Sequence, residues 1–165
     1  MTHQCSVCGT QHDEWPPGYG FSQPDAVWEL SPEQKNGRVM ETPDFCCIDG
    51  TRCFVLANFQ IPVSGLESPW ILSLWAEISQ SDFSQFLGSY AVAVSGSVDG
   101  ILCNHLGAFP GAVGSSVKVH LGSSKARPAL EATDLNSDIG RAQHTGLSQQ
   151  ELHDKLAAMG YDWES

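Results

Sequence analysis

The sequence has 165 residues, of which 41% are hydrophobic and 16% charged, so it fits one globular domain with a sizeable core and not a disordered chain. The sequence contains 8 Lys and Arg residues and 19 Asp and Glu residues, which gives a formal net charge of −11. The resulting negative potential repels phosphate backbones and anionic lipid, which excludes nucleic acid and membrane surfaces as partners. It favours a basic protein partner. Alternatively, the acidic charge only keeps the chain soluble.

The sequence begins Met-Thr-His-Gln-Cys, without a basic region or an apolar run, so we expect no signal peptide. Its longest apolar stretch, residues 70–78, is too short to cross a bilayer. We therefore expect a cytoplasmic protein. In a reducing compartment its six cysteines favour metal ligation or free thiols over disulfides.

The first motif along the chain is Cys5-Ser-Val-Cys8-Gly9-Thr-Gln-His12. Two thiolates three residues apart can face one ion, and Gly9 lets the backbone turn its amides toward sulfur. We expect a structural zinc clip of Cys5, Cys8 and His12, closed by Cys46 of the segment Asp44-Phe-Cys46-Cys47-Ile-Asp49. Iron can occupy the same ligands. A redox pair and plain free thiols are the competing interpretations; the redox pair would need a preceding strand and a following helix.

The next elements are short. Residues 13–28 alternate prolines with aromatic rings, which predicts an extended segment packed on the core or, alternatively, a binding surface. Ser31, Pro32 and Gln34 form a capping-box pattern that predicts a helix to about Met40.

The centre of the chain predicts antiparallel sheet, with strands at 53–63 and 70–78. In the second strand Trp70 and Trp75 fall on opposite faces. We therefore expect one of the two indoles to be exposed, where it could serve as a hot spot for binding a partner. A short helix follows at 81–88, and then a strand with loops over 90–116. The last predicted elements are strands at 117–121 and 128–133, joined by a polar loop, and a capped helix from Ser148 to Gly160.

The predicted fold is therefore α+β, a mostly antiparallel sheet with a few short helices and an N-terminal metal clip resembling a zinc knuckle. We expect a single domain, 1–165, in which the clipped segment 1–50 packs on the sheet at 51–165. Cys46 and Cys47 are adjacent and should point to opposite faces of an extended chain. Cys53 and Cys103 have apolar neighbours in the sequence, and we expect both to be small core residues.

The sequence contains no nucleophile elbow, Walker loop, dinucleotide fingerprint or His-Glu-x-x-His motif. An enzyme of hydrolase type would need acid and base residues in a cleft, for which Asp134 and His120 are the candidates. A hydrogen-bonded structural role is the commoner fate of a strand histidine such as His120.

The order of these pieces resembles a bacterial family known as domain of unknown function 2199. The resemblance runs over nearly the whole chain and is carried by Cys5-x-x-Cys8-Gly9-x-x-His12, Asp44-Phe-Cys46-x-Ile-Asp49, Ile61-Pro62-Val63-x-Gly65, Val119-His120-Leu121 and Gln143-x-x-Gly146-Leu147. It implies no activity, but it singles out Cys46 over Cys47 as the recurring cysteine. The family tends to have His where this chain has Leu135, and residues 88–114 depart from its usual aromatic-rich version.

We expect a zinc-stabilised binding protein without catalytic residues. An acidic immunity-type protein that neutralises a basic toxin is one version of that function, and the hydrolase is the alternative.

Overall fold

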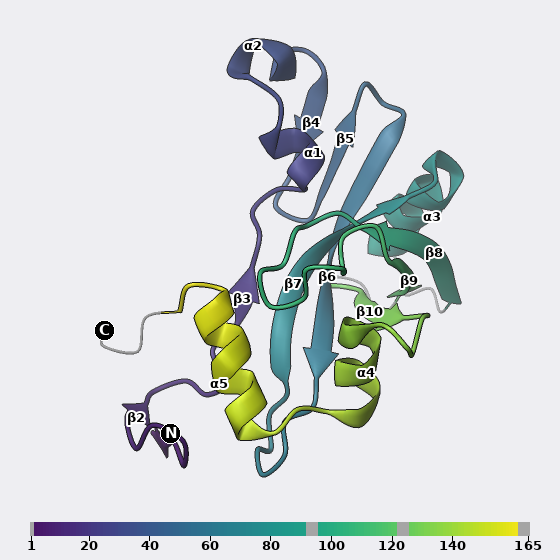
Figure 1. Cartoon of the computed structure of the whole chain (residues 1–165). Helices are drawn as coiled ribbons and strands as arrows, with labels where there is room; N and C mark the ends of the chain where they lie inside the picture. Colours follow the sequence, from purple (N-terminus) through teal and green to yellow (C-terminus); the bar gives the residue numbers. More distant parts are fainter. Residues whose placement is uncertain (1, 92–95, 122–125, 162–165) are drawn as a thin grey trace.

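The computed structural model describes residues 2–91, 96–121 and 126–161 (Figure 1). Its strands are β1 (His3–Gln4), β2 (Gln11–His12), β3 (Tyr19–Gly20), β4 (Val39–Glu41), β5 (Phe45–Ile48), β6 (Arg52–Ile61), β7 (Trp70–Ile78), β8 (Gly96–Leu102), β9 (Ser116–Leu121) and β10 (Ala129–Ala132). Its helices are α1 (Asp25–Trp28), α2 (Pro32–Lys35), α3 (Gln80–Ala91), α4 (Asp138–Thr145) and α5 (Gln149–Ala158).

The centre of the fold is a closed ring of strands in the order β6, β7, β8, β9, β10, with β10 returning to pair with β6. The steps from β6 to β10 are antiparallel, and the closing pair β10–β6 is parallel. Five strands force this result, because a ring with an odd number of strands cannot alternate direction all the way round. The α+β class is as predicted, but the sheet is a barrel and is not simply antiparallel; β3 also joins β7 in parallel.

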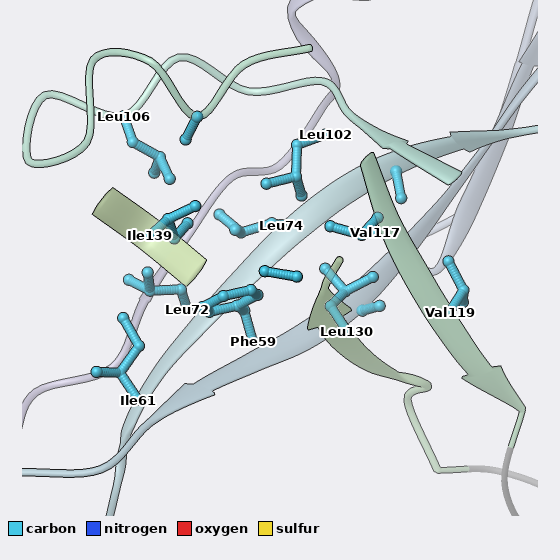
Figure 2. Packing of buried hydrophobic residues seen from close by; sticks show 14 of the residues in the cluster. Phe59, Ile61, Leu72, Leu74, Leu102, Leu106, Val117, Val119, Leu130 and Ile139 are labelled. Atoms are coloured by element: carbon cyan, nitrogen blue, oxygen red, sulfur yellow. The ribbon is translucent and has the colours of Figure 1, made fainter. Parts of the chain in front are cut away.

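The barrel interior is filled by the apolar face of each strand, and Figure 2 shows these side chains meeting. In β7 the predicted alternation is confirmed, since Leu72 and Leu74 face the main core while Trp75 packs in a second cluster. Ile139 of α4 points into the same core (Figure 2). The prediction that Trp70 or Trp75 is exposed is wrong, because both faces of β7 are covered and both indoles are buried.

The second cluster lies on the other face of β6 and β7, where β5 and β4 extend the sheet beyond the barrel and Val27 of α1 packs against it. Asn104 connects this region to the barrel: its side-chain carbonyl accepts a hydrogen bond from Trp75 N (2.8 Å), and its amide donates to Gln23 O (3.0 Å). The α1–α2 arm projects from this end of the molecule (Figure 1).

Several boundaries differ from the predicted ones. The capping box at Ser31 forms, but α2 is only 4 residues long, and Gly37 (φ +73°) turns the chain into β4 where a helix was predicted to Met40. Helix α1 lies inside the segment predicted to be extended, and α4 was not predicted. The predicted loop 122–127 falls largely outside the described residues.

Helix α5 forms as predicted, with the Ser148 capping box present and Leu152 and Leu156 buried. It lies beside the N-terminal hairpin β1–β2, so the two ends of the chain meet (Figure 1). Among the described residues, no helix has the length and apolar character needed to span a bilayer.

Candidate metal centre

The N-terminal motif folds as a small hairpin whose turn presents its sulfur atoms to one side. Strands β1 and β2 pair with His3 opposite His12. The backbone amides of Cys5 and Gly9 bond to Thr10 O and Cys5 O, each at 2.9 Å, and Gly9 takes the positive φ of 72° that the turn requires. Val7 N points at Cys5 Sγ (3.4 Å), as expected of a knuckle whose amides face sulfur.

Three of the predicted ligands come together in this hairpin. One ligand atom from each of Cys5, Cys8 and His12 lies within 4.8 Å of the other two, so this group could hold a metal ion. Cys8 Sγ and His12 Nε2 are 3.5 Å apart. Cys5 and His12 are buried, whereas Cys8 is exposed at the rim.

The surroundings of Cys8 favour its thiolate. Partial desolvation raises the pKa of this thiol, but hydrogen bonds from Thr10, His12 and Cys5 outweigh it and bring the value down to about 6. A metal binds the thiolate form of cysteine. The hairpin therefore holds a thiol that is already largely ionised at neutral pH.

A fourth group that the sequence reasoning missed lies at the same place. Nε2 of His153, in α5, is 2.7 Å from Cys5 Sγ, and His153 is buried. Burial lowers the pKa of this imidazole, and His12 lowers it further, so its ring is neutral near pH 7. The signal in the sequence was a histidine next to Leu152, inside the apolar stripe of an otherwise well-predicted helix.

An indole ring bounds the group on another side. Trp15 stacks on His12 with ring centroids 4.3 Å apart and meets His153 at 5.1 Å with the rings tilted. It also packs against the main core, which fixes its position. The prediction that rings pin the 13–28 segment to the core is confirmed for Trp15, Tyr19 and Phe21, whereas Trp28 is exposed. Trp15 places both imidazoles against one rigid surface.

Cys46, predicted as the closing ligand, is not brought to this group. It lies in β5 at the opposite end of the molecule (Figure 1), buried in the second cluster with Phe54 and Trp75. Burial, followed by the charge of Glu41, raises the pKa of the Cys46 thiol to about 12. Cys46 and Cys47 do point to opposite faces as predicted, but apolar side chains cover both faces.

The two residues of the hydrolase hypothesis lie apart. His120 sits in β9 opposite Ala129 and contacts Glu131 (Nε2–Oε2, 2.6 Å) on the surface. Asp134 follows β10 at its far end, where its carboxylate accepts from Asn136 N (3.0 Å). His120 and Asp134 therefore lie toward opposite ends of β10, and each makes a local contact at the surface.

A family model described as an uncharacterised protein conserved in bacteria, DUF2199, covers residues 4–147. Neither the curated proteins nor the solved structures contain a match to this chain. The matched range includes Cys5, Cys8 and His12 and ends before His153.

Proposed function

We propose that this chain, which belongs to the DUF2199 family of bacterial proteins, is a small zinc-stabilised protein that binds a basic protein partner and performs no catalysis. The observation that carries the proposal is the convergence of Cys5, Cys8 and His12. The acidic charge and an exposed aromatic anchor support the binding role.

The donor set fits zinc. Zinc bonds of about 2.3 Å to sulfur and 2.0–2.1 Å to nitrogen place two ligands of a tetrahedral ion about 3.5 Å apart, which is the separation of Cys8 Sγ and His12 Nε2, 3.5 Å. The hairpin needs such a cross-link, because strands of 2 residues each cannot persist alone in water. Burial of Cys5 and His12 suits a closed structural site better than an open catalytic one.

The binding role is supported by the α1–α2 arm. Trp28 is 59% exposed there, the largest exposed fraction among the exposed large hydrophobic side chains of the described residues. Glu29 and Glu33 of the same arm are exposed, and Lys35 Nζ lies over the Trp28 ring, 5.9 Å from its centroid. An exposed aromatic anchor on an arm with exposed carboxylates suits a partner with exposed Lys or Arg, since Trp contributes contact area and the carboxylates contribute orientation and rate of association. A basic toxin such as a nuclease is one partner of this kind.

The metal part of the proposal is tested on protein purified without a metal-affinity tag. We expect a single tightly held zinc ion per chain in the wild type, its loss in Cys8→Ala, and its retention in the control Cys46→Ala, which removes a cysteine at the other end of the molecule. Wild-type protein without metal, and unable to take up zinc at low micromolar concentration, would overturn it.

The binding part is tested with the basic proteins encoded next to this gene, each co-expressed and then titrated in pure form. We expect an affinity that falls steeply with added salt and at least tenfold in Trp28→Ala, with little change in the control Leu135→Ala, another exposed hydrophobic residue. If none of these basic neighbours binds, the binding role loses its support.

A further inference from the structure

We propose that His153 is the fourth ligand of the metal ion, so that the ion ties the N-terminal hairpin to helix α5 and joins the two ends of the chain. This inference rests on the metal site proposed above and adds a residue that lies beyond the family match, 4–147. The site becomes a closed Cys₂His₂ centre of Cys5, Cys8, His12 and His153.

The position of His153 is fixed by its helix. Leu152 and Leu156, on either side of it along α5, are fully buried in the main core. The rotation of α5 about its axis is thereby set, and Nε2 of His153 is directed at Cys5 Sγ, 2.7 Å away. Both groups are buried, as the ligands of a structural site usually are.

A second contact holds the same two segments together. Ser6 Oγ donates to Gln149 Oε1 at 2.8 Å, and Gln149 stands one turn before His153 on the same face of α5. Gln149 Nε2 in turn donates to Ser64 O (3.1 Å). The hairpin is therefore seated on α5 at two successive turns, with the sulfur–imidazole contact as the buried one.

Cys5, Cys8 and His12 already lie within 4.8 Å of one another, and His153 contacts this group through Cys5. The 3.5 Å between Cys8 Sγ and His12 Nε2 equals the spacing expected of two tetrahedral ligands, about 3.5 Å. The 2.7 Å between Cys5 Sγ and His153 Nε2 is a hydrogen-bond distance, and these atoms must separate by about 0.8 Å to share an ion. Rotation of the Cys5 side chain supplies that shift, while Trp15, against both imidazoles, keeps them in place.

The charge of the four proposed ligands also suits Zn²⁺. Two thiolates balance the charge of Zn²⁺, and two neutral imidazoles complete four-coordination without adding charge to a partly buried place. A thiol–imidazole hydrogen bond with no metal is the competing explanation of the 2.7 Å contact. It predicts that loss of His153 leaves zinc affinity unchanged.

The test compares His153→Gln with His144→Gln, a matched change on the exposed face of α4. Metal-free full-length chains are titrated with Zn²⁺ against a chromophoric chelator, and with Co²⁺, whose visible spectrum reports coordination. We expect zinc affinity to fall by more than about 100-fold in His153→Gln. Mutation of a residue that only hydrogen-bonds to a metal ligand already lowers metal affinity by about 10–100-fold, and loss of a ligand itself should cost more. We expect the cobalt spectrum to lose its tetrahedral S₂N₂ form, and His144→Gln to match the wild type.

The outcomes separate this inference from the proposed function. Wild-type protein that takes up no zinc overturns both. Zinc held by the wild type and by His153→Gln with equal affinity overturns the role of His153 alone. Should His153→Gln fail to fold, ¹⁵N NMR of the wild-type imidazoles decides: zinc must shift the ring nitrogens of both His12 and His153, and a shift confined to His12 overturns the inference.

Discussion

Cys47 and Cys53 face each other across β5 and β6, directly opposite in register, with their Sγ atoms 2.8 Å apart. Both are buried, and burial together with the hydrogen bond that the Cys47 thiol donates to Cys53 Sγ raises the pKa of Cys47 to about 12. The Cys47 thiol therefore remains protonated at neutral pH. It stands in contrast to Cys8, which is exposed and has a lowered pKa.

This contrast predicts the order in which the cysteines react. In metal-free protein at pH 7, iodoacetamide should modify Cys8 first, because the thiolate is the nucleophile and the pKa of Cys8 is about 6. Cys46 and Cys47 should react only after unfolding in denaturant. Peptide mass spectrometry over a time course measures each site, and the Cys8 rate should fall as the pH drops below about 6.

Two comparisons sharpen this experiment. Zinc should protect Cys8, and the Cys8→Ala variant should lack the fast phase altogether. Native protein in which Cys46 is alkylated as quickly as Cys8 would contradict the burial of β5 described above.

Gly140 of α4 provides a steric prediction. A Cβ at this position would overlap the backbone oxygen of Asp134 and lie 2.8 Å from Ser137 Oγ, and the backbone cannot yield as a flexible side chain does. We expect Gly140→Ala to lower the free energy of unfolding by about 3 kcal/mol. Urea unfolding followed by circular dichroism measures it.

The matched control is Gly88→Ala in α3, where a Cβ meets no atom within 4 Å. Alanine is the better helix former, so this change should raise stability by up to about 1 kcal/mol. Equal effects of the two substitutions would show that the close approach of α4 to Asp134 is not as described.

Asn104 provides a third prediction. Its side chain accepts from Trp75 N (2.8 Å) and donates to Gln23 O (3.0 Å), which continues the hydrogen bonding of β7 beyond the end of β8. Asn104→Ala leaves a buried amide of β7 without its acceptor, at a cost of about 1–3 kcal/mol. Denaturant unfolding should show this loss, and the exposed control Asn36→Ala should lie within about 0.5 kcal/mol of the wild type.

Local patterns predicted the local structure. The alternation of Trp70 to Ile78 and the Ser148 capping box depend on neighbours a few residues apart, and both elements form as expected. The closure of the barrel depends on the pairing of β10 with β6, and the 67 residues 62–128 lie between these strands, so no local pattern records that pairing. The predicted mostly antiparallel sheet was therefore incomplete.

The metal centre shows the same limit. Cys5, Cys8 and His12 are neighbours in the chain, and their spacing alone predicted the group. The choice of Cys46 depended on residue type, and the buried cysteine proved to be a core residue of β5. His153 lies 148 positions from Cys5, so only the docking of α5 brings the two together.

The Ser148 capping box links helix stability to the metal site. Ser148 Oγ accepts from Glu151 N (3.1 Å), and Glu151 Oε2 accepts from Ser148 N (2.7 Å), at the first turn of the helix that carries His153. Ser148→Ala should cost about 1 kcal/mol of stability. Because the fraying end of α5 also seats the hairpin, zinc affinity should fall several-fold.

The control for this prediction is Ser31→Ala, which removes the same capping box from α2 (Gln34 N to Ser31 Oγ, 3.2 Å). That helix buries no residue and lies at the opposite end of the molecule from the hairpin (Figure 1). Thermal unfolding and zinc titration of both variants give the comparison. Ser31→Ala should leave zinc affinity unchanged, because no cap on α2 is connected to the hairpin. If Ser148→Ala loses stability but holds zinc as tightly as Ser31→Ala, the ion does not depend on the order of α5 and binds through the hairpin alone.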